Sequence, residues 1–231
     1  MADRPIIFSA PMVRALLDGR KSQTRRILGN SGPGRGRFNI FSAQIGWSDS
    51  YVLDPGNAGW RERDTPYAPG DRLWVRECWR TASAYDDLSP SQMGGEEPIR
   101  YEADQTWQTW GWGRPHSTGR HRAARHMPRW ASRLTLLVTD VRVQRLQDIS
   151  EADAKAEGSF LGRCKCMPPQ KSGDAINRMF RQTWCRYCGQ EFSDLWNSIH
   201  GPDAWDANPW VAAISFETRR YNIDTMEEGT W

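Results

Sequence analysis

The chain has 231 residues, of which 38% are hydrophobic and 26% are charged, and its formal net charge is +3. That length suits one globular domain with a sizeable core, while a mean hydropathy of −0.75 and the lack of any long apolar run exclude a membrane-spanning helix. No basic segment followed by an apolar one opens the chain, so we expect a cytoplasmic protein without membrane contact. The mild basic excess is compatible with a nucleic-acid partner.

The first third of the chain predicts one short helix and one long loop. Ser9 and Pro11 are typical of a helix N-terminus, and Gly19 is a natural stop, so the helix has about two turns. We expect Met12, Leu16 and Leu17 to form its apolar face. The polar, basic stretch 20–26 that follows is expected on a loop or at the start of a strand. Residues 29–69 are rich in Gly, Pro, Asn, Asp and Ser, which predicts a long surface insertion.

The rest of the chain alternates between strand and helix patterns. Strands are predicted at 71–79, 99–101, 132–146 and 210–216, and helices at 148–157 and 192–199. Strands that are separated by short helices favour an α+β fold built on a small β-barrel. We therefore expect a single domain over residues 1–231, with insertions at about 29–69, 80–131 and 159–190.

Four of the five cysteines cluster in two close pairs, Cys164 with Cys166 and Cys185 with Cys188. Two pairs of thiols suit a tetrahedral zinc ion, and four cysteines fill its coordination shell, so this zinc would be structural and not catalytic. Reduced, unpaired thiols on an insertion are the alternative. Cys78 stands alone among apolar residues and is expected in the core rather than as a nucleophile.

The basic stretch carries a lysine and a threonine three residues apart, Lys21 and Thr24. A hydroxyl becomes a good nucleophile when a base removes its proton, and a lysine is a base only when it is neutral. Burial or a neighbouring cation such as Arg20, Arg25 or Arg26 would lower the pKa of Lys21 toward that state. A carboxylic acid would then protonate the leaving nitrogen. A solvated basic turn, or one that contacts phosphate, is the common alternative for such residues.

Residues 19–26 read Gly-Arg-Lys-Ser-Gln-Thr-Arg-Arg, and this segment resembles the signature of the ASCH domain family. Three further segments match the pattern of that family: Gly-Asp-Arg-Leu at 70–73, Ile-Ser-Glu at 149–151 followed by Glu157, and Ile-Ser-Phe-Glu at 214–217. The likeness covers about half of the chain and is greatest to the bacterial N4-acetylcytidine amidohydrolases of the family and to their larger phage-type relatives.

The resemblance implies a PUA-like β-barrel and an amidohydrolase that releases cytidine and a carboxylate from N4-acylcytidine. It implies Lys21 as the base, Thr24 as the nucleophile and Glu157 as the proton donor, with Arg26 as a substrate-binding residue. The three insertions have no counterpart in the minimal enzyme of the family.

Further candidates lie outside the matched segments. Glu77, predicted on a strand, is a second candidate for the acid or for substrate binding, and a salt bridge with an arginine is its alternative. His126 and Trp130 are expected to frame the mouth of a pocket, where Trp130 either stacks on a base or packs in the protein. Residues 114–129 hold several arginines and histidines, which are typical of a phosphate-attracting surface and also of a solvated loop.

Tryptophan is frequent, with 13 residues against 7 Phe and 6 Tyr. Its flat rings serve both cores and base-binding surfaces. We expect core positions for Trp74, Trp196, Trp205 and Trp210. Positions beside a flat ligand are expected for Trp107, Trp110, Trp112 and Trp130. A second hypothesis is therefore a non-catalytic PUA-like module that binds single-stranded RNA. A ribonuclease is a third and weaker one.

Overall fold

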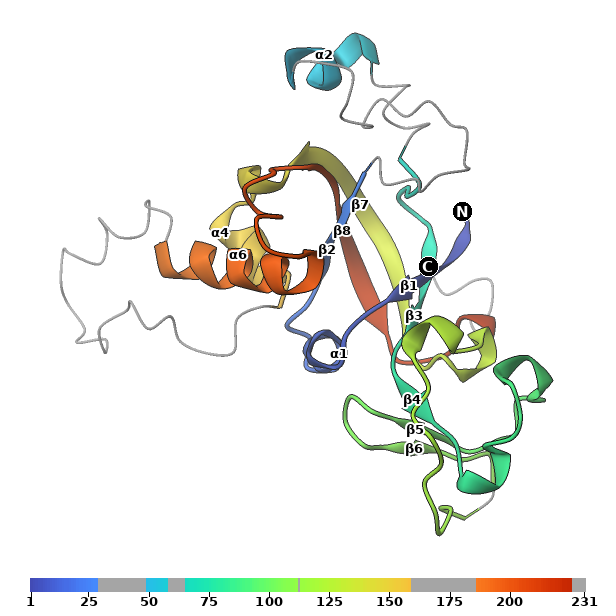
Figure 1. Ribbon diagram of the computed structural model, residues 1–231. Helices are drawn as coiled ribbons and strands as arrows, with labels where there is room; N and C mark the ends of the chain where they lie inside the picture. The colour runs from blue at the N-terminus through green and yellow to red at the C-terminus, as the bar shows by residue number, and fades with distance from the viewer. Residues whose placement is uncertain (29–48, 58–64, 112, 159–185, 226–231) are drawn as a thin grey trace, which may run out of the picture. The chain divides into compact units, whose positions relative to one another are not determined.

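The computed structural model describes residues 1–28, 49–57, 65–111, 113–158 and 186–225 (Figure 1). This part of the chain is a mixed α+β structure in which sheet predominates over helix, as expected. The predicted insertions at 29–69 and 159–190 lie largely outside the described residues. No helix in the described ranges has both the length and the apolar character needed to cross a membrane.

The strands and helices keep the chain order that is labelled in Figure 1. The described strands are β1 (Asp3–Ile7), β2 (Gln23–Ile27), β3 (Arg72–Arg76), β4 (Trp79–Arg80), β5 (Ile99–Tyr101), β6 (Trp107–Gln108), β7 (Thr135–Arg145) and β8 (Trp210–Arg219). The described α-helices are α1 (Ala10–Leu17), α2 (Asp49–Leu53), α4 (Glu151–Ala156) and α6 (Arg186–His200). Short 3₁₀ turns occur at Pro55–Asn57, Ser83–Tyr85, Pro90–Gln92, Ala124–His126, Arg129–Ala131, Leu146–Asp148 and Ile223–Thr225.

The strands form two sheets. One has five strands in the order β1-β3-β7-β8-β2, and the other has three in the order β4-β5-β6. β1 runs parallel to β3, with Ile6 opposite Val75, whereas β2 runs antiparallel to β8, with Thr24 opposite Ile214. The order of the larger sheet is open, ending at β1 and β2, and no closed barrel is found among the described strands.

The chain divides into two compact units. The first unit comprises Met1–Gly19, Pro69–Thr139 and Phe216–Trp231, and the second comprises Arg20–Ala68 and Asp140–Ser215. β7 and β8, the two longest strands described, contribute residues to both units. Each unit has an apolar cluster of its own.

The first unit contains α1 and the three-stranded sheet. α1 begins after Ser9 and ends before Gly19, whose positive φ of 70° favours glycine. Its buried residues are Val13, Ala15 and Leu16, whereas Met12 and Leu17 of the predicted face are only half-buried. The buried face of α1 is therefore rotated relative to the predicted one. The sequence did not distinguish the two faces, because this short helix has apolar residues on several sides.

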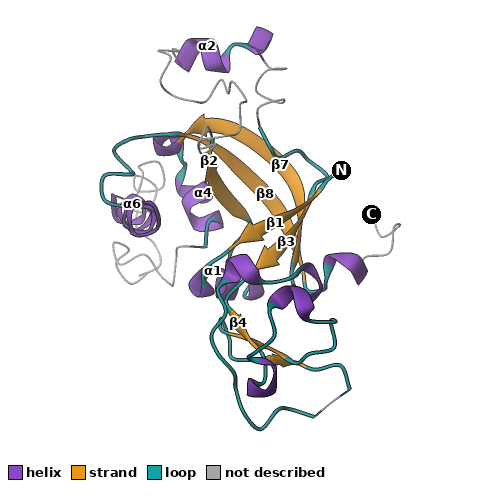
Figure 2. Ribbon diagram, turned by 45° about the vertical axis from the view of Figure 1, so that its right-hand side comes forward, coloured by secondary structure: helices purple, strands orange, loops and turns teal. Residues whose placement is uncertain are grey.

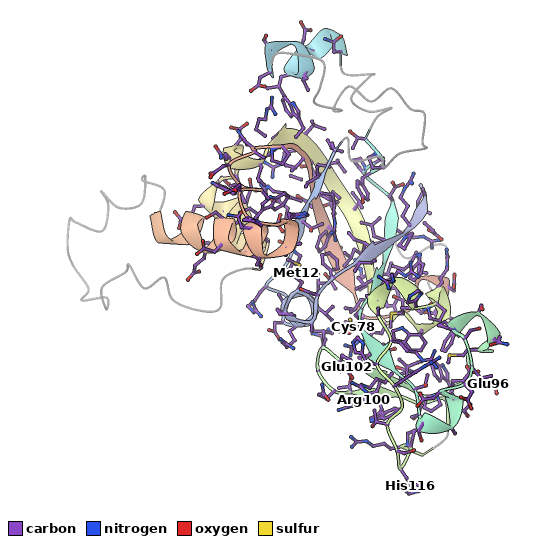
Figure 3. The ribbon with its side chains drawn as sticks, in the orientation of Figure 1. Met12, Cys78, Glu96, Arg100, Glu102 and His116 are labelled. Carbon is purple, nitrogen blue, oxygen red and sulfur yellow. The ribbon has the colours of Figure 1, made fainter. Side chains whose placement is uncertain are left out.

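The strand predicted at 71–79 is broken in two. β3 pairs with β1 and β7, whereas β4 pairs with β5 in the smaller sheet, so the chain leaves one sheet at Glu77 and Cys78 and joins the other. Cys78 is half-buried, and its carbonyl oxygen accepts a hydrogen bond from the Glu102 N–H at 3.0 Å (Figure 3). Apart from Trp79, the smaller sheet lies within the segment predicted as an insertion at 80–131.

An apolar cluster supports this sheet. It consists of Trp79, Met93, Ile99, Tyr101, Met127 and Ala131. The hydroxyl of Tyr101 donates a hydrogen bond to the Ala131 carbonyl at 3.0 Å, which ties β5 to the turn before β7. This part of the chain therefore has a core of its own.

The second unit contains α4 and α6, which pack side by side next to the β2 end of the larger sheet (Figure 2). α4 begins after Ser150, whose hydroxyl accepts a hydrogen bond from the Asp153 N–H at 3.1 Å, as expected for an N-cap. Its apolar cluster is formed by Leu146, Ile149, Ala154, Phe192, Trp196 and Val211. α6 starts at Arg186 rather than at the predicted residue 192, so the backbone of Cys188 lies in this helix.

The tryptophans predicted in the core are Trp74, Trp196, Trp205 and Trp210. Trp74, Trp196 and Trp210 are buried, whereas Trp205 is half-buried against the cluster of the second unit. Among the residues predicted beside a ligand, Trp107 and Trp130 are half-buried, Trp110 is exposed, and Trp112 lies outside the described residues.

Candidate active site

A lysine and a glutamate that are 136 residues apart in the chain meet in the second unit. Nζ of Lys21 donates hydrogen bonds of 2.8 Å to Oε2 of Glu157, to the Glu157 carbonyl oxygen and to the Gln23 carbonyl oxygen. Lys21 is 1% exposed and Glu157 is 4% exposed. All three protons of a charged lysine therefore have acceptors, which is the condition under which a buried ammonium is tolerated.

Local structure explains how Glu157 reaches this position. It is the C-cap residue of α4, and its N–H donates to the Asp153 carbonyl oxygen at 2.9 Å. Gly158 follows with a positive φ of 73°, which ends the helix and turns the chain away. The segment before β2 is held against the last turn of α4, because the Ser22 N–H donates a hydrogen bond to the Ala156 carbonyl oxygen at 2.9 Å.

Arg25, predicted only as a cation near Lys21, completes the contacts of Glu157. Its guanidinium donates to Oε1 of Glu157 at 3.0 Å and to Oε1 of Gln23 at 2.7 Å, and it forms an ion pair with Asp153 at 3.3 Å. Both carboxylate oxygens of Glu157 are thus held, one by Lys21 and the other by Arg25. This fixes the orientation of the carboxyl group.

A second layer of polar contacts surrounds Asp153. Nε2 of Gln23 donates to Oδ1 of Asp153 and to Oγ of Ser215, both at 3.2 Å, and Arg142 donates to Asp153 at 2.9 Å. Burial opposes the charge of Asp153, but hydrogen bonds from Arg142 and Ser150 keep its pKa below the usual range. None of these supporting residues was a predicted site residue. The two-residue period of a strand, which places Gln23 and Arg25 on one face, is the signal that would have found two of them.

Thr24 lies on the other face of β2. Because side chains alternate along a strand, Thr24 and Arg26 share one face while Gln23 and Arg25 share the opposite face toward α4. Thr24 is buried, with 3% of its surface exposed. Arg26 is close enough to Lys21 for its charge to act on the lysine. The structure therefore brings Lys21 and Glu157 into contact, whereas it places Thr24 in β2 on the face opposite Gln23 and Arg25.

The electrostatics of the site favour a lysine that loses its proton more easily than usual. Burial lowers the pKa of Lys21 from its ordinary value and is the largest effect. The charge and the hydrogen bond of Glu157 raise this pKa, while the nearby charges of Arg26 and Arg25 lower it further. The net direction is downward, toward the neutral form that a general base requires.

The pKa of Arg26 is also lowered by burial, and the charge of Glu157 opposes the shift. Arg26 was predicted to bind substrate, and its place on the Thr24 face is compatible with that role. An arginine retains its charge even when its pKa falls somewhat, so Arg26 supplies a fixed positive charge beside the lysine.

The second carboxylate candidate, Glu77, lies in the first unit. It is 1% exposed, and its two oxygens accept hydrogen bonds of 2.8 and 2.9 Å from Arg133. Arg133 also donates to Asp104 at 2.8 Å. Burial raises the pKa of Glu77, and the hydrogen bonds and charge of Arg133 oppose this. Glu77 thus forms the alternative considered for it, a salt bridge with an arginine, in which Glu77 is buried and Arg133 is half-buried.

His126 and Trp130 also belong to the first unit and lie in different surroundings. His126 is exposed, and its Nε2 accepts a hydrogen bond from Nε of Arg125 at 3.0 Å. It lines a surface hollow, of which Trp130 is not a lining residue. Trp130 packs instead with its ring near Gly95 and edge-on to Trp110, with 5.7 Å between the ring centroids. The packing interpretation of Trp130 is therefore the one that the structure favours.

The predicted zinc site falls almost wholly outside the described residues. Cys164, Cys166 and Cys185 lie there, and the side chain of Cys188 is not described either. The described side chains contain no cluster of His, Cys, Asp and Glu that would hold a metal ion. Four-cysteine coordination of structural zinc thus stays a prediction.

The second unit contains the buried amine of Lys21, the carboxyl group of Glu157 in contact with it, and the hydroxyl of Thr24 in β2. Comparisons of the chain with protein-family models, with curated proteins and with solved structures found no match. The chemistry of this site is therefore inferred from its own residues. They are an amine, a carboxyl group and a hydroxyl, residue types from which amide hydrolysis through a covalent intermediate can be built.

Proposed function

We propose that this chain is an amidohydrolase that cleaves the N4-acyl amide of N4-acylcytidine or related cytosine nucleosides. The observation that supports the proposal is the buried contact of 2.8 Å between Lys21 and Glu157. These are two of the three residues to which the resemblance to the ASCH family assigns catalysis. The PUA-like fold of that family is part of the same proposal.

The Lys21–Glu157 contact provides for both proton transfers. Movement of one proton from Nζ to the carboxylate converts the ion pair into a neutral amine and a carboxylic acid, which are the forms of base and acid that the reaction uses. The lowered pKa of Lys21 favours this transfer. Arg25 opposes it, because its hydrogen bond to Oε1 stabilises the ionised carboxylate.

In the proposed reaction, Nζ of Lys21 takes the proton of the Thr24 hydroxyl while Oγ1 attacks the acyl carbon. The tetrahedral intermediate collapses by breaking the bond between the acyl carbon and N4, and Glu157 gives its proton to N4 of the departing cytosine. An ester on Thr24 results. Lys21 now carries the proton that came from Thr24, and Glu157 has given its own proton to N4, so the ion pair is restored. Water then hydrolyses the ester, which releases the carboxylate and regenerates the threonine. In the variant route, Lys21 activates water that Thr24 positions.

The second candidate function is binding of single-stranded RNA without catalysis. It is favoured by the first unit, where exposed Trp110 lies against Trp130 and where arginines and histidines surround a surface hollow. Such an activity would not need the Lys21–Glu157 pair.

Hydrolysis of N4-acetylcytidine, followed by the absorbance change on conversion to cytidine, tests the proposal. We expect turnover by the purified chain and its loss in Lys21→Ala and in Thr24→Ala. Ser22→Ala is the matched control, because Ser22 carries a hydroxyl in the same segment but is exposed. Circular dichroism shows that each variant is folded. A folded chain that does not hydrolyse N4-acetylcytidine but binds single-stranded RNA in a salt-dependent manner would contradict the amidohydrolase and support the alternative.

A further inference from the structure

The first unit contains a surface hollow of about 300 Å³ with a basic lining. The lining residues are Pro90, Arg120, His121, Arg122, Ala123 and His126. None of the six is acidic, and four carry nitrogen donors. We call this feature the basic hollow; its volume is at the lower end of the range for small-molecule sites.

Arg122 is held rigidly at the basic hollow. Its backbone N–H donates to the Trp79 carbonyl oxygen at 2.9 Å, and the backbone N–H of Trp79 donates to the Arg122 carbonyl oxygen at 3.1 Å. The guanidinium lies over the Trp79 ring, 5.4 Å from the centroid, and Nη2 donates to the Tyr85 carbonyl oxygen at 2.9 Å. The arginine is thus oriented before any ligand arrives, which reduces the entropy lost on binding.

Arg122 has a buried positive charge that no carboxylate of the described residues pairs with. It is 5% exposed, and its buried Nε has no hydrogen-bond partner among them. The other arginine of the buried set, Arg25, is bound by two carboxylates. Asp86, the acid whose charge acts on Arg122, is engaged with the N–H of Arg120 at 2.8 Å. A buried guanidinium without a carboxylate is unfavourable, and an anion from solution would relieve this.

The other donors around the hollow suit a ligand with several oxygens. Arg120 and His121 are exposed at its wall. Nε2 of His126 accepts a hydrogen bond from Arg125, which leaves Nδ1 as the ring nitrogen that can contact a ligand. Forked arginine donors match the oxygens of a phosphate better than they match a neutral ligand.

We infer that the basic hollow binds a phosphate group, carried either by a mononucleotide or by a strand of RNA. Arg120 and Arg122 supply the charge, and the two histidines supply additional hydrogen bonds. The inference concerns the first unit alone, so it does not rest on the proposed amidohydrolase.

Isothermal titration calorimetry of the full chain with adenosine 5′-monophosphate and with adenosine tests this inference. Adenine ligands are chosen because they are not substrates or products of the proposed reaction. We expect the nucleotide to bind and adenosine to bind at least about tenfold more weakly, since only the nucleotide offers charge-assisted hydrogen bonds. Arg120→Glu should weaken binding of the nucleotide about tenfold or more, and Arg122→Lys should weaken it severalfold because the fork is lost.

Arg114→Glu is the matched control, because Arg114 is exposed in the same basic segment but does not line the hollow. Thermal unfolding verifies that the variants are folded. A decamer of oligoadenylate identifies the source of the phosphate: tighter binding with a steeper salt dependence than the nucleotide points to RNA, and equal binding points to a mononucleotide. Absence of binding by both phosphate ligands overturns the inference. So does equal binding of adenosine, or equal weakening by Arg114→Glu and Arg120→Glu.

Discussion

At the scale of single residues, Lys21 is the centre of the candidate active site. Its side chain is almost fully buried and touches a carboxylate, while two arginines lie within electrostatic reach. Burial and the arginines lower its pKa, and Glu157 raises it. A base of this kind works in the neutral form, so the surroundings of Lys21 determine the pH at which the site is active.

The pH dependence of kcat/KM is therefore predictable in direction. In the proposed reaction Lys21 and Glu157 share one proton, and the pair loses it as the pH rises through the pKa of Lys21. We therefore expect kcat/KM for N4-acetylcytidine to fall at high pH, with the midpoint of the fall below 10.5, the ordinary pKa of lysine. Arg26→Gln removes a charge that lowers this pKa, so the falling limb should move to higher pH. Arg219→Gln, an exposed site, is the control. A limb that stays in place or moves to lower pH in Arg26→Gln would contradict the assignment of Lys21 as the base.

Glu157 also carries a stability prediction. Glu157→Gln removes the negative charge that Lys21 and Arg25 share, and leaving buried cations uncompensated destabilises a protein by about 3 kcal/mol. Urea unfolding measures the change. Glu151→Gln breaks a partly exposed pair with Lys155 and should lower the free energy of unfolding by only about 0.5 kcal/mol. Equal effects of the two substitutions would show that the buried network contributes little to stability.

At the scale of elements, α4 and β2 together build the site. Ser150 caps the start of α4, and Glu157 with Gly158 forms its end. The end of this short helix therefore positions the carboxyl group of Glu157 next to Lys21. β2 places Gln23 and Arg25 toward α4 and Thr24 on its other face. The positions of Glu157 and Thr24 thus depend on how a helix ends and on how a strand alternates.

The end of α4 is tested by Gly158→Ala. The φ of 73° at Gly158 is unfavourable for a residue with a Cβ, so the substitution should lower the free energy of unfolding by about 1 kcal/mol. Because Glu157 is the preceding residue, we also expect a lower kcat. Gly94→Ala is the control, since Gly94 lacks a positive φ and has open space around it. Loss of stability with full activity would show that the orientation of Glu157 does not depend on this turn.

At the scale of the whole molecule, the two units carry different chemistry. The second unit holds the Lys21–Glu157 site, and the first holds the buried Glu77–Arg133 pair and the basic hollow. Each has an apolar cluster of its own. The proposed hydrolysis and the inferred phosphate binding are therefore testable independently of each other.

The four clustered cysteines give a prediction for the chain as a whole. If they hold structural zinc, protein purified without added metal should contain about one equivalent by elemental analysis. Removal of the zinc by a chelator should lower the thermal midpoint of unfolding, because the free energy of metal binding contributes to folding. Cys78→Ser, which changes a thiol outside the cluster, should retain its zinc. Less than about half an equivalent in the unmodified protein would count against the four-cysteine site.

Local patterns predicted much of the secondary structure. The strands at β5 and β7, the start of β8 and the helices α1 and α4 were confirmed, because hydrophobic alternation, caps and glycine stops act over a few neighbouring residues. The break between β3 and β4 was not predicted, since it depends on partner strands from different sheets. The start of α6, six residues before the predicted one, was not predicted either.

For the candidate site, the sequence by itself determined which residue types were available: a lysine and a threonine three apart, and a glutamate at a helix end. Only the tertiary structure decided that Glu157 is shared by Lys21 and Arg25 and that Glu77 is bound to Arg133. It also decided that Arg122 is buried without a carboxylate partner among the described residues. Contacts between residues that are more than fifty positions apart depend on how strands and helices pack, and short-range patterns carry no information about that.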